Sequence, residues 1–355
     1  MQTLTSQFQV KKLNVSGPTP AERSMPSVAT LNNYIYVFGG VKDDFKTSVD
    51  TFYDDLNRFN IKENTWENIS TRGASPKPRA FSTLIADANN NRILLFGGVH
   101  YGKSFSNLVT FDDLWAYSPD QNTWTQIQPA NEGPQGRGGA SVWLDNNLMY
   151  VFGGVKDFTH MLNDLWVYDL QNNTWTQLGE DNSINAPTGR YTCYNDTKAW
   201  NGKLYLYGGE GIGKKGFSIT NDTWQYDIKT KTWTDITPSP ENNVTPARVQ
   251  GSMAIIDNSL LLQGGDIKER SVKGCGSPFP ENANDELWQF NLATKVWSPL
   301  TADGVILPKH KRAGSTVVDK KMYILFGYDF QCNNENDLGQ VWNKDIYVLD
   351  FKNLK

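Results

Sequence analysis

An arginine follows a proline by two to four residues at six places in the chain, each time just ahead of an apolar segment. A guanidinium group is a planar fork of N–H donors that matches the two oxygens of a carboxylate. Several such groups at one site would also focus a positive potential on an acidic ligand. We therefore expect a carboxylate-binding site built from six side chains: Arg23, Arg79, Arg137, Arg190, Arg248 and Arg312.

These arginines belong to a repeat whose most regular part is a glycine pair at the end of a hydrophobic run. The run reads YIYVFGG at its first occurrence and MYILFGY in its degenerate last copy. The first glycines lie 58, 56, 55, 56 and 63 residues apart, which indicates one supersecondary unit repeated along the chain. The copies are Gly39-Gly40, Gly97-Gly98, Gly153-Gly154, Gly208-Gly209, Gly264-Gly265 and Gly327-Tyr328.

A second motif follows each glycine pair and completes the unit. An acidic residue opens a short apolar segment, as in DLWVY at Asp164, and in five copies a tryptophan follows the closing aromatic by seven residues, as from Tyr168 to Trp175. Turn-forming residues lie between the two, so the motif predicts a hairpin and each unit has four strands. The acidic residues are Asp55, Asp113, Asp164, Asp222, Glu286 and Asp345.

The double glycine, the spaced aromatic residue and the tryptophan together resemble the kelch motif, over nearly the whole chain. The resemblance implies an all-β fold: a six-bladed kelch β-propeller with four antiparallel strands per blade around a central channel. The tryptophans then serve as flat anchors between the sheets. We expect a single domain over residues 1–355, with blades at about 18–70, 75–128, 134–179, 186–237, 245–301 and 307–352.

The sixth blade has no outer strand of its own, because the chain ends soon after the DIYVL segment at Asp345. Val10 and Leu13 reproduce the three-residue spacing found between Trp175 and Leu178. We predict that an N-terminal strand over residues 8–14 completes blade 6 and closes the ring.

In substrate-adaptor kelch propellers, arginines at this point of the repeat bind acidic peptide segments. The resemblance therefore implies that the six arginines line one mouth of the channel and bind a partner protein or an acidic peptide. The alternative is an architectural role, in which each arginine bonds loop carbonyls or pairs with an acidic residue of the next blade. The repeated acidic residues are expected to satisfy turn N–H groups.

The loops between the second and third strands should open on the same face as the arginines. They vary from nine residues in blade 3 to twenty in blade 5, as expected of a binding face. Aromatic side chains dominate protein interfaces, so Tyr101 and Phe105 in blade 2 and Tyr328 and Trp342 in blade 6 are further candidates for partner contacts. The alternative is simple packing of long loops over the channel.

Enzymatic chemistry has little support in the sequence. The three histidines, His100, His160 and His310, do not stand at metal-ligand spacing, so no catalytic residue, metal or cofactor is predicted. The alternative function is a small-molecule enzyme or isomerase that uses the channel mouth, as plant specifier proteins and a bacterial sugar mutarotase do on this fold. The iron-binding spacing of the specifier proteins is absent, and Cys275 is expected to be inert.

Composition and net charge argue against several functional classes. A net charge of −4 and a pI near 5.5 argue against nucleic-acid binding, and no apolar run is long enough to span a membrane. The three cysteines have no metal spacing, which favours reduced thiols in the cytoplasm. We expect a monomeric cytoplasmic interaction module or scaffold that binds neither nucleic acid nor membranes.

Overall fold

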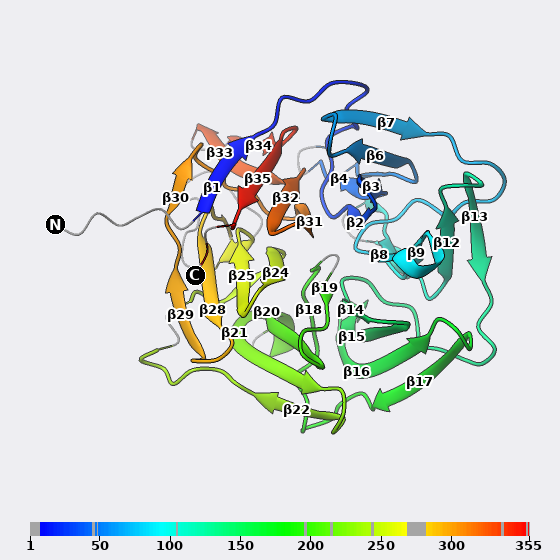
Figure 1. Cartoon of the computed structure of the whole chain (residues 1–355), viewed down its shortest axis with the longest axis vertical. Helices are drawn as coiled ribbons and strands as arrows, with labels where there is room; N and C mark the ends of the chain where they lie inside the picture. The colour runs from blue at the N-terminus through cyan, green and yellow to red at the C-terminus, as the bar shows by residue number, and fades with distance from the viewer. Residues whose placement is uncertain are drawn as a thin grey trace.

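The computed structural model describes residues 8–44, 47, 49–103, 106–194, 197–213, 216–242, 245–267, 282–334, 337–352 and 354. Six small sheets stand around a common centre, which confirms the predicted six-bladed β-propeller (Figure 1). The described residues include one short 3-10 helix, η1 (Ala88–Asn90), and no helix long and apolar enough to cross a bilayer.

Five blades have the predicted four antiparallel strands, numbered here from the channel outward. Blade 1 consists of β2 (Ser27–Leu31), β3 (Tyr34–Phe38), β6 (Leu56–Asn60) and β7 (Thr65–Ile69). Blade 2 consists of β8 (Thr83–Asp87), β9 (Arg92–Phe96), β12 (Leu114–Ser118) and β13 (Thr123–Ile127). Blade 3 consists of β14 (Ser141–Asp145), β15 (Leu148–Asp157), β16 (His160–Asp169) and β17 (Thr174–Gly179). Blade 5 consists of β24 (Ser252–Ile256), β25 (Ser259–Gln263), β28 (Leu287–Asn291) and β29 (Val296–Pro299). Blade 6 consists of β31 (Gly314–Val318), β32 (Lys321–Leu325), β35 (Ile346–Asp350) and β1 (Phe8–Lys12), with β30 (Ala302–Gly304) outside β1.

Blade 4 departs from the prediction at its inner edge. Its outer strands β20 (Lys203–Gly213), β21 (Gly216–Asp227) and β22 (Thr232–Asp235) are regular, and β18 (Arg190–Tyr191) pairs only with the far end of β20. The innermost segment β19 (Thr197–Lys198) pairs in parallel with β14 of blade 3 instead. The hydroxyl of Thr197 donates to the carbonyl of Val142, so a polar side chain fixes this exchange between blades.

A hairpin extends the second and third strands of each blade beyond the glycine pair. In blades 3 and 4 it is continuous with the long strands β15, β16, β20 and β21. The separate pieces are β4 (Val41–Lys42) with β5 (Thr51–Phe52), β10 (Val99–His100) with β11 (Val109–Thr110), β26 (Asp266–Ile267) with β23 (Arg248–Val249) and β27 (Asn282–Ala283), and β33 (Tyr328–Asn334) with β34 (Asp337–Trp342).

The glycine pairs lie where neighbouring blades touch. The N–H of Gly98 donates to the carbonyl of Arg137 in the next blade at 2.9 Å. A Cβ on Gly97 would stand 2.7 Å from the same carbonyl oxygen, and both glycines have positive φ. Only glycine allows this approach of two backbones, which explains why the pair recurs.

A buried arginine clamps the first strand of a blade to its third. In blade 3, the Nη1 and Nη2 of Arg137 donate to Oδ1 and Oδ2 of Asp164 at 2.6 and 2.9 Å, and Nη1 also donates to the carbonyl of Gly153 at 3.0 Å. The same arrangement holds three other blades through Arg23–Asp55, Arg79–Asp113 and Arg190–Asp222. Each arginine pairs within its own blade, not with the next blade as the architectural alternative supposed.

The carboxylate of the clamp has a second partner that the sequence analysis did not anticipate. The indole N–H two residues farther along donates to it, as Trp115 does to Asp113 at 2.8 Å. Burial alone would raise the pKa of Asp113, but the hydrogen bonds and charge of Arg79 outweigh it, so the pKa lies below its usual value. The repeated aspartates of blades 1 to 4 are thus counter-ions of the arginines and not caps of turns.

Blade 5 carries a weaker version of the clamp, and in blade 6 a histidine without a side-chain hydrogen bond takes the place of the arginine. Arg248 donates to the carbonyl of Gly264 at 3.0 Å, but its Nη2 stays 3.6 Å from Glu286. In blade 6 the position belongs to His310, whose carbonyl accepts the N–H of Gly265 as the arginine carbonyls do elsewhere. Burial lowers the pKa of His310 to about 4, so this ring is neutral near pH 7. Arg312, aligned with the other five by its sequence spacing, lies two residues beyond the clamp position.

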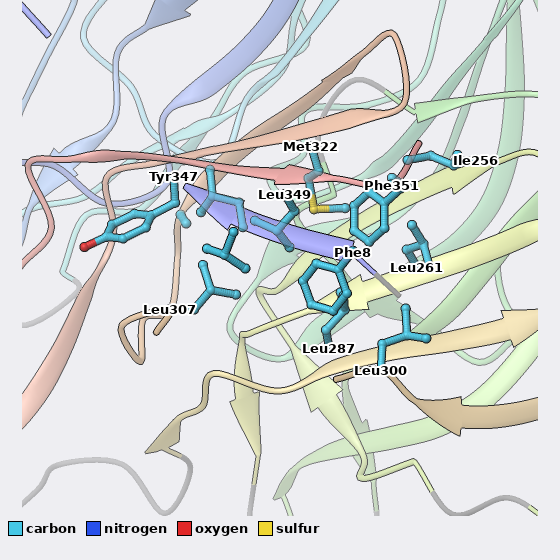
Figure 2. Close-up of a cluster of buried hydrophobic side chains, with 14 residues drawn as sticks. Phe8, Ile256, Leu261, Leu287, Leu300, Leu307, Met322, Tyr347, Leu349 and Phe351 are labelled. Atoms are coloured by element: carbon cyan, nitrogen blue, oxygen red, sulfur yellow. The ribbon is translucent and has the colours of Figure 1, made fainter. Parts of the chain in front are cut away.

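The N-terminal strand closes the ring as predicted. β1 pairs antiparallel with β35, Val10 lying opposite Leu349 and Lys12 opposite Tyr347. Figure 2 shows Phe8 and Leu349 in the apolar cluster between blades 5 and 6, and the ring of Phe8 stacks on that of Phe351 at 5.2 Å. Opposite ends of the chain therefore share one core.

Deleting residues 1–13 should lower the melting temperature and promote aggregation, because it uncovers the edge of β35 and the cluster around Phe8. The point variants Val10→Asp and Lys11→Asp provide a matched test, since Val10 is buried and Lys11 exposed. We expect thermal unfolding of Val10→Asp alone to shift downward. Equal melting temperatures for both variants and the wild type would contradict closure by this strand.

Arg137→Ala should lower the free energy of unfolding by about 3–5 kcal/mol, because it leaves the carboxylate of Asp164 buried without its partner. The control is Arg58→Ala, which breaks an ion pair to Glu67 in which both side chains are partly exposed, and should lose about 1 kcal/mol or less. Urea denaturation of both variants measures the difference. Similar losses for the two would show that the clamp contributes no more than a surface pair.

Candidate functional site

The arginine clamps and the strand-2 to strand-3 hairpins lie on one face of the propeller, which we call the hairpin face. The residue after each clamp position bridges the first residues of the hairpin, as Ser24 does to Val41 and Lys311 to Tyr328. This placement agrees with the expectation that the variable loops open on the side of the arginines.

Six residues, one from each blade, form a ring around the channel just inside this face. Each has a left-handed backbone, with φ between 51° and 65°, and stands two residues after the clamp position, or three in the case of Cys193. Five backbone hydrogen bonds run around the ring, among them Gly139 N–H to the carbonyl of Phe81 at 2.7 Å and Met25 N–H to that of Arg312 at 2.8 Å. This channel ring consists of Met25, Phe81, Gly139, Cys193, Gln250 and Arg312.

A chain of polar side chains crosses the mouth above the channel ring. Arg312 is its centre: Nη1 donates to Oδ2 of Asp43 at 3.1 Å and Nε to Oε1 of Gln250 at 3.0 Å. On one side the hydroxyl of Tyr101 donates to Oδ1 of Asp43 at 2.9 Å. On the other, Gln250 donates to the hydroxyl of Tyr191 at 3.2 Å, and Tyr191 donates to Glu210. This mouth network consists of Tyr101, Asp43, Arg312, Gln250, Tyr191 and Glu210, and it joins five blades.

The electrostatics of the mouth network fix its protonation. Burial, with the charge of Asp43 beside it, raises the pKa of Tyr101 well above its usual value, so the phenol remains a donor. Burial would lower the pKa of Arg312, but the surrounding tyrosines and Asp43 raise it, so the guanidinium stays charged. Burial raises the pKa of Glu210 although Tyr191 donates to it. The mouth therefore contains a permanent cation held by neutral donors and carboxylates.

A second ion pair lies beside this network. Lys311 Nζ stands 3.2 Å from Oδ2 of Asp266 and 4.6 Å from the ring centre of Phe330. Burial lowers the pKa of Lys311, and Asp266 opposes that shift. Burial also raises the pKa of Asp329 to about 6. Two cations, Lys311 and Arg312, thus stand among carboxylates at the mouth, which is not the uniformly positive ring that six arginines would make.

The structure places the candidate partner-binding residues in different environments. Five arginines are buried in or beside blade clamps, and only Arg312 reaches the mouth. Tyr101 belongs to the mouth network, whereas Tyr328 is buried against Trp342 and Phe330, with ring centroids 4.8 and 5.4 Å apart. Trp342 is half-buried on β34, and Phe105 lies outside the described residues. Partner binding by these side chains stays a prediction.

Several mouth residues escaped the sequence analysis although a signal for them was present. An acidic residue follows the glycine pair directly at Glu210 and Asp266, and by three residues at Asp43. These three carboxylates face the mouth cations. Their spacing from the glycines could have identified them.

Most of the exposed large apolar side chains lie on the hairpin face. Among the described residues ten large apolar side chains are exposed, and six of these, 40–62% exposed, lie on strand-2 to strand-3 hairpins of five different blades. Three more lie in segments that lead into the first strand of a blade: Ile184, Val305 and Ile306. The six on the hairpins are Val49, Val109, Phe158, Ile212, Phe217 and Val341.

Metal-dependent or thiol chemistry finds no arrangement to support it within the described part of the chain. No three His, Cys, Asp or Glu side chains there are grouped to hold a metal ion. Cys193 lies in the channel ring, and burial raises the pKa of its thiol, which keeps it protonated. Cys275 lies outside the described residues.

Comparison with known proteins agrees with the fold. The family model of the KLHDC2/KLHL20/DRC7 Kelch-repeats domain matches residues 2–194 and 183–355. Kelch domain-containing protein 10 is 27% identical over 296 residues, covering 80% of this chain and 66% of the protein from Rattus norvegicus or 61% of that from Homo sapiens. Host cell factor 2 of Homo sapiens is 26% identical over 363 residues, covering 94% of this chain and 43% of that protein.

The chain spans less than two thirds of the length of these relatives. The family model nevertheless covers the six repeats, and the glycine pairs, clamp residues and tryptophans lie where the blades of the structure need them. The chain belongs to the kelch-repeat family.

Proposed function

We propose that this propeller is a protein-interaction module whose partner docks on the hairpin face. The observation that carries the proposal is the set of exposed apolar side chains on hairpins of five blades. Exposed apolar side chains on several hairpins of one face supply contact residues for a protein partner. The repeat architecture supplies the rigid support, because each hairpin continues strands that are locked by buried clamps.

The charged residues at the mouth indicate the chemistry of the partner. We propose that an acidic segment of the partner reaches the mouth and shares the guanidinium of Arg312 with Asp43. Arg312 is the one candidate arginine outside a blade clamp, and its bonds to Asp43 and Gln250 hold it at the centre of the mouth. Lys311 stands next to it in the chain and adds a second cation.

The double variant Phe158→Ser/Phe217→Ser should weaken partner binding at least about tenfold, since two exposed aromatic anchors are removed. The partner is first isolated by affinity purification from the native cell, and its dissociation constant is then measured by calorimetry with purified proteins. Val296→Ser is the matched control, because Val296 is 45% exposed but lies on the outer strand β29. Unchanged affinity in the double variant, or an equal loss in the control, would refute docking on the hairpin face.

Replacing Arg312 tests the acidic segment separately. Arg312→Ala should weaken binding by roughly 2–5 kcal/mol, Arg312→Lys should restore part of it, and added salt should weaken wild-type binding. Melting temperatures of the same samples show whether the mouth network still holds the blades together. A folded Arg312→Ala protein with wild-type affinity would remove the acidic segment and leave the hairpin-face proposal standing.

A further inference from the structure

The outer edge of a blade is covered by the linker that enters the blade, meaning the segment between the outer strand of the preceding blade and the first strand of its own. In blade 1 the N–H of Ser16 donates to the carbonyl of Asn64 at 3.0 Å, and the N–H of Trp66 donates to the carbonyl of Ser16 at 2.8 Å. The N–H groups of Arg72 and Ala130 bond the equivalent carbonyls of blades 2 and 3. In blade 6 the linker forms β30, which runs parallel to β1. Four outer strands therefore have an added parallel segment.

Each of these four linkers contains a glycine near the bonded segment, namely Gly17, Gly73, Gly133 and Gly304, and all of them except Gly73 closely approach the outer strand. A Cβ on Gly17 would stand 2.3 Å from the carbonyl oxygen of Trp66, and one on Gly304 would stand 2.4 Å from that of Val10. A Cβ on Gly133 would stand 2.6 Å from the indole of Trp175. Close approach of the linker to the outer strand thus requires glycine in at least three blades.

Blade 4 lacks this cover. Its linker, residues 180–189, has no glycine before Gly189, which directly precedes the clamp residue Arg190, and the linker is held on the hairpin of blade 3 instead. His160 bonds Asp181 at 2.6 Å, and the side-chain amide of Asn163 donates to the carbonyls of Ser183 and Pro187 at 2.9 and 3.1 Å. The whole linker is described by the structure, so its departure from β22 is an observed feature.

The edge of β22 is consequently open. The positions equivalent to the bonded carbonyl of Asn64 and the N–H of Trp66 are the carbonyl of Lys231 and the N–H of Trp233, and neither has a partner on that side among the described residues. Thr232, Thr234 and Asp235 are exposed. Trp233 is only partly buried, whereas Trp66, Trp124 and Trp175 are 2–5% exposed. Figure 1 shows β22 on the perimeter of the ring.

We infer that the edge of β22 is a second interaction site, distinct from the hairpin face, which takes an extended segment of a partner polypeptide. The segment runs parallel to β22 and places a glycine against the backbone of Trp233. The occupant follows from blades 1, 2, 3 and 6, where the same edge receives a glycine-containing segment through backbone hydrogen bonds. Strand addition of this kind draws affinity from the main chain and selectivity from one or two side-chain positions.

The test measures amide hydrogen exchange, residue by residue, in the full chain by NMR. The amide of Trp233 should exchange at least about tenfold faster than those of Trp66 and Trp175, because its N–H is open. The probe is a synthetic peptide with the sequence of residues 13–19, LNVSGPT, which covers the edge of blade 1. We expect it at millimolar concentration to slow exchange at Trp233 and shift its indole resonance, and a peptide with valine in place of the glycine to do neither.

Three outcomes would overturn the inference. The first is a Trp233 amide as protected as that of Trp66 in the free chain. The second is equal protection by both peptides, which would show contact without strand addition. The third is protection that rises with protein concentration alone, together with a dimer in sedimentation, which would assign the edge to a second copy of the chain.

Discussion

The contact on which the rest of the propeller depends is the buried guanidinium–carboxylate clamp. Arg137 binds the carboxylate of Asp164 and the carbonyl of Gly153 at once, so one side chain ties together three strands of its sheet. Its own carbonyl accepts the N–H of Gly98, which ties that sheet to its neighbour. Taking the two charges out of water is unfavourable by itself, and the two charge-assisted bonds to Asp164, with the bonds of Arg137 to the carbonyls of Gln135 and Gly153, compensate for it.

The clamp explains why the hairpin face can vary. The strands below each hairpin are fixed by buried charges and glycines, so the hairpins above can differ in length and in exposed side chains without disturbing the ring. The mouth network adds a contact between blades that the repeat does not supply. Asp43 of blade 1 and Arg312 of blade 6 are joined there, and Gln250 and Tyr191 carry the connection on to blade 4.

Features of the repeat could be predicted from the sequence because they are local and periodic. The strands around each glycine pair, the hairpin before Trp175 and the closing strand at Val10 all follow from spacing within one unit. The role of the arginines could not be settled in the same way, because a repeated cation suits a clamp as well as a binding ring. In blade 6 the run His310-Lys311-Arg312 offers three basic residues, and only packing decides that the histidine takes the clamp position. The bond between Asp43 and Arg312 joins opposite ends of the repeat series, which no short-range pattern reveals.

The pairing of β1 with β35 also has a consequence for how the ring forms during synthesis. Val10 meets Leu349 across a loop of roughly 340 residues, the longest sequence separation in the fold. β1 therefore lacks this partner until β35 has left the ribosome, and at usual rates of synthesis it waits for tens of seconds. Its alternation of buried Phe8 and Val10 with exposed Gln9 and Lys11 leaves it half polar while it waits. A short strand with charged residues and alternating polarity is poorly suited to pairing with the wrong strand. The ring can therefore close late without an aggregation-prone apolar segment exposed during synthesis.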